Sequence, residues 1–151
     1  RKSEKLVHFD SFFYPLDKLR NWNRLYGRSG FLQYQFVLPK EESYRGLRKI
    51  LEAIQRSGQG SPLAVLKLLG KADPNCVMSF PMSGYTLAID FKISPLVFVL
   101  LDSLDKIVME HGGRIYLAKD ARMSPAVFNN TYKRRVDSGQ FRSLQAKRLE
   151  F

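Results

Sequence analysis

The feature that most constrains the fold of this chain is the alternation of strand and helix patterns between residues 31 and 118. Two segments, 40–58 and 94–113, repeat apolar side chains at helical spacing and end at glycines. Ser94 and Pro95 add an N-cap and a first-turn proline to the second helix. Four segments have the apolar runs of strands: 31–39, 62–70, 84–92 and 114–118. The order β-α-β-β-α-β predicts an α+β, ferredoxin-like fold, in which an antiparallel sheet carries both helices on one face.

The flanks divide the chain into three parts. Residues 1–30 are expected to form a lead-in with a short helix over 15–27, because Leu16, Leu19 and Tyr26 recur at helical spacing before Gly27. Residues 31–118 form the predicted domain. Residues 119–151 form a C-terminal helical segment that starts anew at Ser124. The chain begins without an initiator Met, so we expect it to be a piece of a longer polypeptide.

Strand alternation assigns each strand residue to one of two faces of the sheet. The face toward the helices is predicted to hold Leu32, Tyr34, Phe36, Ala64, Leu66, Leu68, Tyr85, Leu87, Ile89, Phe91, Ile115 and Leu117. The opposite face then holds Gln33, Gln35, Leu63, Val65, Lys67, Leu69, Thr86, Ala88, Tyr116 and Ala118. An apolar floor with a few polar groups is the composition of a binding site or a wet interface between domains. The alternative is an ordinary exposed sheet on which Lys67 extends its ammonium into water.

Two further expectations concern burial. In residues 40–58 the apolar face is carried by Tyr44, Leu47, Leu51 and Ile54, which we expect against the sheet. On the opposite face, Lys67 stands among Leu63, Val65 and Leu69, so its ammonium is predicted to be partly desolvated unless an anion meets it. Lys67 is therefore a candidate for binding phosphate or hydroxyl groups.

The net charge of +11 favours an anionic partner: nucleic acid, an anionic membrane surface, or a phosphorylated substrate or cofactor. The single cysteine, Cys76, excludes an internal disulfide, suits a reducing compartment and is expected to be a small semi-buried side chain. The histidines, His8 and His111, belong to no cluster with metal-ligand spacing, so no metal site is predicted. We expect His111 to interact with the C-terminal carbonyls of its own helix.

Four stretches carry a resemblance to a known family: FLQYQFVLP, SPLAVLKLLG, SFPMSGYTLAIDF and GGRIYLAKDARMS. In this order they resemble the C-terminal, substrate-binding half of FAD-linked oxidases of the vanillyl-alcohol-oxidase/aldonolactone-oxidase class, from about Trp22 to the C-terminus. The resemblance implies a flavoprotein oxidoreductase that moves hydride from a secondary hydroxyl of a sugar to FAD. Residues 31–118 would be its substrate-binding (cap) domain, and residues 119–151 would pack on an N-terminal FAD-binding domain outside this chain.

The resemblance also implies the site residues. A substrate-binding role falls to Gln33, Gln35, Leu63, Val65, Lys67, Thr86, Ala88 and Tyr116, which all lie on the uncovered face derived above. Tyr116 and Lys119 would contact the flavin, and Lys119 would be the catalytic residue that hydrogen-bonds the reacting oxygen. The alternative for Lys119 is a solvated lysine at a strand end, paired with Asp120. Asp120 and Arg122 are expected to fix the loop or to pair locally.

The implied substrate is a sugar, with a polyprenyl-phosphate-linked pentose of cell wall biosynthesis as one candidate and a soluble sugar lactone as the alternative. A reductase partner, a cytoplasmic location and peripheral contact with the inner membrane would fit this interpretation, and nucleic acid would not. A competing class is a basic ferredoxin-like RNA-binding module. Such modules stack bases on exposed aromatic residues, whereas the predicted open face has Tyr116 alone and no ribonucleoprotein motif.

Overall fold

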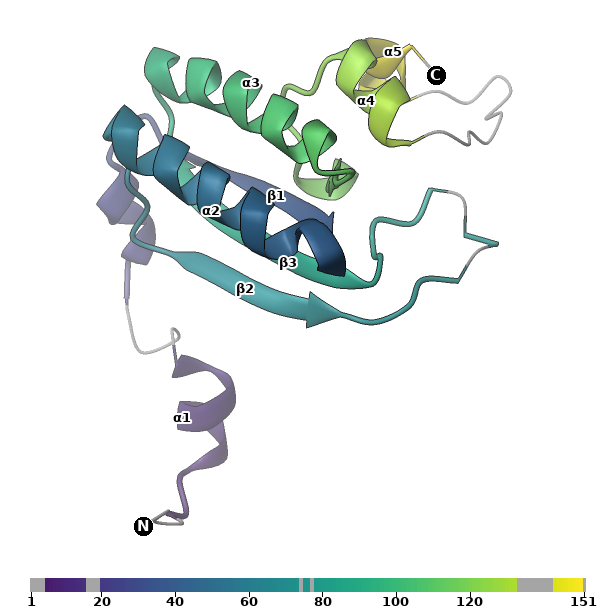
Figure 1. Ribbon diagram of the computed structural model, residues 1–151. Coiled ribbons are helices and arrows are strands. Elements are labelled where there is room, and N and C mark those ends of the chain that lie inside the picture. Colours follow the sequence, from purple (N-terminus) through teal and green to yellow (C-terminus); the bar gives the residue numbers. More distant parts are fainter. Residues whose placement is uncertain (1–4, 16–19, 74, 77, 133–142, 151) are drawn as a thin grey trace.

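The computed structural model describes residues 5–15, 20–73, 75–76, 78–132 and 143–150. The central elements are β1 (Phe31–Pro39), α2 (Lys40–Ser57), β2 (Ala64–Leu69), β3 (Gly84–Lys92), α3 (Pro95–Glu110) and β4 (Arg114–Ile115). The sheet has the strand order β2-β3-β1-β4, and every neighbouring pair is antiparallel. Both helices lie on the same face of this sheet (Figure 1). The predicted ferredoxin-like arrangement is therefore confirmed.

The core lies between the sheet and the two helices. Phe36, Leu87 and Phe91 project from β1 and β3 and are buried against Leu101 and Leu104 of α3. The signals that begin α3 act as expected, since the Ser94 hydroxyl accepts a hydrogen bond from the backbone N–H of residue 97 and Pro95 opens the helix.

The face that α2 presents to the sheet differs in part from the prediction. Leu47 and Ile54 are partly buried and pack against the core, as predicted. Tyr44 and Leu51 are 77% and 53% exposed, whereas Gly46 and Ile50 are buried. The reason is close packing at Gly46, where an added Cβ would lie 2.5 Å from Cδ1 of Leu38. A glycine contributes nothing to an apolar pattern, yet it sets the side on which this helix meets the sheet.

The edge strand β2 also departs from the expectation. Ala64, Leu66 and Leu68 were predicted to lie under the helices, but all three are exposed. Figure 1 shows the reason, because α2 and α3 lie over β1 and β3 and leave β2 at the uncovered edge of the sheet.

The fourth strand is shorter than predicted. β4 spans Arg114–Ile115, and a 3-10 helix, η3 (Leu117–Lys119), replaces the expected strand end. The backbone N–H of Tyr116 still donates to the carbonyl of Gln35, and the chain then turns away from β1. The carboxylate of Asp120 secures this turn by accepting from two following backbone N–H groups, those of residues 122 and 123.

The described residues of the flanking segments form three short α-helices: α1 (Phe9–Phe13), α4 (Pro125–Thr131) and α5 (Leu144–Leu149). The helix start predicted at Ser124 is confirmed. The helix predicted over 15–27 is instead the 3-10 helix η2 (Trp22–Tyr26) in its described part, while residues 16–19 lie outside the described residues. Within the described part of the chain, no helix is long and apolar enough to cross a bilayer.

Candidate functional site

The helix-free face of the sheet brings the predicted site residues together. In the strand register, Gln35 lies opposite Ala88, Val65 lies opposite Ala88, and Lys67 lies opposite Thr86. Directly opposed residues of an antiparallel pair share a face of the sheet. The residues that alternate with them, such as Phe36 and Leu87, pack in the core with residues of α2 and α3, so these five side chains project on the opposite side of the sheet. The register agrees with the face derived from strand alternation.

Two glutamines on this face are held by side-chain hydrogen bonds. The amide of Gln35 donates to the hydroxyl of Thr86 over 3.1 Å, and the amide of Gln33 donates to Asp90 over 2.7 Å. Asp90 also accepts from the Tyr26 hydroxyl at 3.3 Å. Thr86 and Asp90 are each only 2% exposed, so these bonds satisfy groups that would be costly to bury alone. The bonds fix the orientation of both amides, and no hydrogen bond between described residues uses the side-chain oxygens, which can accept from a ligand.

Asp90 is a residue of this face that the sequence interpretation did not assign to the site. Alternation along β3 places Asp90 on the same face as Thr86 and Ala88, so the sequence pattern could have assigned it to the site. Its partner Tyr26 is 64 residues away in the chain and comes from η2, so the hydrogen bond could not be inferred from local sequence.

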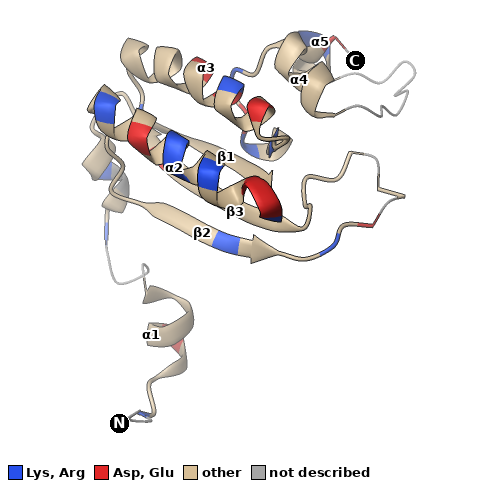
Figure 2. Ribbon diagram, in the orientation of Figure 1, with Lys and Arg blue, Asp and Glu red and all other residues tan. Residues whose placement is uncertain are grey.

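Lys67 is more exposed than predicted. The expectation of a partly desolvated ammonium is wrong, because β2 is an edge strand and its residues 64–68 are all exposed. Figure 2 shows Lys67 as the single charged band on β2. Within the described part of the chain it makes no ion pair, so its ammonium is free to meet an anionic or hydroxyl group. Leu63 lies half-buried just before this strand.

Tyr116 lies near the β4 edge of the helix-free face. Its ring packs on Phe80 at 4.5 Å between centroids, and this contact holds the loop before β3 against η3. Near Tyr116, Lys119 lines a small crevice together with Gln33 and Gln35. The volume of this crevice is about 10 Å³. A space of this size holds no more than a single water molecule. The crevice beside Lys119 therefore cannot hold a sugar, which would need a further wall to be enclosed there.

Lys119 and its neighbours have separate roles in this loop. Lys119 is exposed and makes no ion pair with any described residue, so the alternative in which it pairs with Asp120 is not seen. Asp120 instead pairs with Arg148 of α5 and accepts from the backbone N–H groups of residues 122 and 123. Burial by itself would raise the pKa of Asp120, but these hydrogen bonds together lower it.

Arg122 is also bound locally, as predicted. Its guanidinium contacts the carboxylates of Asp105 and Asp102, each at 2.7 Å. Asp105 is 2% exposed and also accepts a hydrogen bond from the Tyr34 hydroxyl at 2.9 Å. Burial raises the pKa of Asp105, although Arg122 and Tyr34 act in the opposite direction. Asp120 and Arg122 thus anchor the loop, and Lys119 is left free beside the crevice.

Two other side chains differ from their predicted positions. His111 does not contact the carbonyls at the end of α3 through its ring. Its Nδ1 lies 2.8 Å from a carboxylate oxygen of Glu42 in the first turn of α2, so it joins the two helices. Cys76, expected to be semi-buried, is exposed, because it lies in the loop between β2 and β3.

Comparison with known proteins places this geometry in context. No family model matches the chain. Over 97% of its length the chain is 40% identical to decaprenylphosphoryl-beta-D-ribose oxidase of Mycolicibacterium smegmatis, and the match covers 34% of that protein. An uncharacterized protein in the mprA 5′ region of Streptomyces coelicolor is 32% identical over 66% of the chain and 26% of its own length. The chain is therefore a homologue of about one third of decaprenylphosphoryl-beta-D-ribose oxidase.

Proposed function

We propose that this chain forms the substrate-facing part of an FAD-dependent oxidoreductase that oxidises a secondary hydroxyl of a sugar to a ketone. The observation that carries the proposal is that Gln33, Gln35, Lys67 and Thr86 share the helix-free face. Lys119, which makes no ion pair with a described residue, lies beside the two glutamines. The 40% identity to a decaprenylphosphoryl-beta-D-ribose oxidase supports the same assignment.

The chemistry of the helix-free face suits a sugar. A sugar presents hydroxyl groups that both donate and accept hydrogen bonds, along with apolar C–H surfaces. Gln33 and Gln35 offer fixed amide oxygens, Lys67 offers a cation, and Val65 and Ala88 offer apolar surface. Lys67 would also suit a phosphate carried by the sugar.

The residues near Lys119 fit a flavin at the same face. Lys119 is an exposed cation with no partner among the described residues, and a flavin ring carries carbonyl oxygens that such a donor can meet. The aromatic ring of Tyr116 lies in the same loop. When bound, the flavin supplies the hydride acceptor, and the protein supplies binding and orientation. We assign to Lys119 a hydrogen bond to the reacting hydroxyl oxygen, which would hold that oxygen in position during oxidation.

The small volume of the crevice beside Lys119 supports an enclosing partner. With only a small crevice beside Gln33 and Gln35, a sugar on this face would stay exposed to water. An FAD-binding domain from elsewhere in the same polypeptide would close the site, and residues 119–151 would contact it. The relative of known function is about three times as long as the matched segment, which leaves length for such a domain.

The substrate that we favour is a polyprenyl-phosphate-linked pentose of cell wall biosynthesis. The name of the relative supports this choice, and the net charge of +11 supports contact with a phosphorylated lipid at the cytoplasmic surface of the inner membrane. A reductase would then reoxidise the flavin. An RNA-binding role would need two free aromatic rings on this face. Tyr116 packs on Phe80 and Phe31 packs on Tyr26, which favours the oxidoreductase.

The test is to purify the complete polypeptide that carries this chain and to record its flavin absorbance. We expect a bound flavin that is bleached without oxygen by a prenylphosphoryl ribose of short chain. Bleaching by a soluble sugar lactone alone would favour the aldonolactone-type alternative. A folded but colourless protein that gains no flavin when FAD is added would contradict the proposal.

A further inference from the structure

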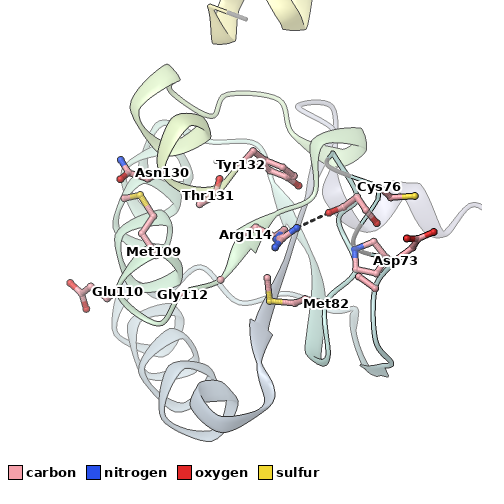
Figure 3. A pocket seen from close by; sticks show the side chains of 14 residues that line it. Asp73, Cys76, Met82, Met109, Glu110, Gly112, Arg114, Asn130, Thr131 and Tyr132 are labelled. Carbon is pink, nitrogen blue, oxygen red and sulfur yellow. Dashed lines mark hydrogen bonds between the residues drawn. The ribbon is translucent and has the colours of Figure 1, made fainter. Parts of the chain in front are cut away.

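A cavity of about 840 Å³ lies beside the C-terminal end of α3. Its walls come from the loop before β3, from the turn between α3 and β4, and from the end of α4 (Figure 3). Neither Lys119 nor any of the eight predicted substrate-binding residues lines it. The volume lies within the range of roughly 300–1,000 Å³ that is typical of small-molecule sites.

Arg114 is the cation at the centre of this cavity (Figure 3). One terminal nitrogen of its guanidinium donates to the Ser79 carbonyl at 2.7 Å, and the guanidinium carbon lies 5.7 Å from the centre of the Tyr132 ring. Tyr132 is itself buried and donates its hydroxyl proton to the Ile115 carbonyl at 2.6 Å. The guanidinium is thus held on two sides before any ligand arrives, which lowers the entropic cost of binding one.

Among the described residues, no carboxylate neutralises the charge of Arg114. It makes no ion pair with a described residue, and its Nε is buried without an acceptor among them. Asp73 and Glu110 also line the cavity, but Figure 3 shows both carboxylates at the rim, pointing away from Arg114. Glu110 contacts Lys49 at 3.8 Å. The centre of the cavity therefore carries a positive charge in a protein whose net charge is +11.

The walls beside Arg114 are apolar and adaptable. Met82 and Met109 line the cavity from opposite sides (Figure 3). Methionine side chains adjust to the shape of an apolar group. Such a site can bind an organic anion in two ways at once. The preorganised guanidinium binds the oxyanion, and the apolar walls contact the organic body.

We propose that this cavity binds a small organic anion, with its phosphate or carboxylate on Arg114 and its organic body between Met82 and Met109. The assignment does not depend on the flavin chemistry proposed above. A guanidinium binds the negatively charged oxygens of phosphate esters and of carboxylates alike. Experiment must therefore distinguish these two classes of ligand.

The test is an amide NMR titration of the chain with phenyl phosphate, with benzoate and with inorganic phosphate, at low and constant ionic strength. We expect saturable shifts at Gly112, Gly113 and Thr131, which line the cavity, from at least one of the organic anions. A stronger response to phenyl phosphate would identify a phosphate ester, and a stronger response to benzoate would identify a carboxylate. Inorganic phosphate should bind more weakly than the organic anion, because it lacks the body that the methionines contact.

Two variants distinguish a site from general charge attraction. Met82→Glu places a carboxylate in the cavity and leaves the contacts of Arg114 with Ser79 and Tyr132 in place, so it should weaken binding at least about tenfold. Arg56→Gln removes an exposed cation from the last turn of α2, which does not line the cavity, and should leave the titration unchanged. The inference is overturned if no anion saturates these amides, if Met82→Glu binds as tightly as the parent chain, or if inorganic phosphate binds as tightly as the organic anions. Shifts of equal size around Lys67 would overturn it as well.

Discussion

Gln35 and Thr86 are joined by a side-chain hydrogen bond of 3.1 Å across β1 and β3, on the face of the sheet that the helices leave open. Thr86 is 2% exposed although no helix covers it, whereas Gln35 is half-buried. The bond therefore satisfies a buried hydroxyl and directs the remaining polar atoms of the amide outward.

Replacing Thr86 by Val tests this arrangement. The variant keeps the shape of the side chain but removes the acceptor of the Gln35 amide, so the free energy of unfolding should fall by about 1 kcal/mol. In the complete enzyme, the KM for the sugar should rise by a factor of about 3 to 10, since the amide is no longer oriented. Urea unfolding and steady-state kinetics measure the two effects. Tyr85→Phe, on the other face, is the matched control, and an equal rise in KM there would refute the role of Thr86.

The contact of Asp105 with Arg122 and Tyr34 is expected to be the most costly to break. Asp105→Ala leaves the guanidinium of Arg122 without its buried partner and should reduce the free energy of unfolding by about 3 kcal/mol or more. Tyr34→Phe removes one hydrogen bond and should cost about 1 kcal/mol. Denaturant titration of both variants gives the comparison. Asp102→Ala, which removes the exposed partner of the same arginine, should change stability by less than about 1 kcal/mol; a cost equal to that of Asp105→Ala would contradict this account.

Because of the close packing at Gly46, we expect Gly46→Ala to lower stability, although helix propensity alone would favour alanine. Alanine is the better helix former, but its Cβ would lie 2.5 Å from Leu38 and 3.2 Å from the His111 ring, so Gly46→Ala should destabilise the fold by about 1–3 kcal/mol. Gly60→Ala is the control, because nothing lies within 4 Å of its added Cβ. Thermal unfolding of both variants decides the point, and a Gly46→Ala protein as stable as the parent chain would show that α2 does not pack as closely as described.

The lowered pKa of Asp120 predicts that this residue contributes to the loss of stability of the fold at low pH. Its pKa is lowered in the folded chain, despite its burial, by hydrogen bonds from the backbone N–H groups of residues 122 and 123 and from Arg148. A depressed carboxyl pKa contributes stability that is present above the unfolded value, near 3.9, and is lost as the pH falls through the folded value. Stability measured from pH 6 downward should therefore fall less steeply in Asp120→Asn than in the parent chain. Parallel curves for the two proteins would contradict this role of Asp120.

Much of the fold could be predicted from the sequence, because periodicity and end signals are local. The antiparallel sheet with both helices on one face followed from the element order, and the shared face of Gln35, Lys67 and Thr86 followed from alternation. What could not be predicted depends on contacts between distant residues. Gly46 sets the face of α2 by contacting Leu38 and His111, and Asp90 is held by Tyr26 from η2.

The most direct measurement of the central claim is the rate of flavin reduction by substrate in the complete enzyme carrying Lys119→Ala. Lys119 is exposed and unpaired among the described residues, so the variant should fold with a change in stability within about 0.5 kcal/mol. We expect the reduction rate to fall by about 10²-fold or more, because the hydrogen bond to the reacting oxygen is lost. Lys106→Ala, an exposed lysine on α3, should reduce flavin at the parent rate. A Lys119→Ala enzyme that binds flavin and is reduced as fast as the parent would contradict the account.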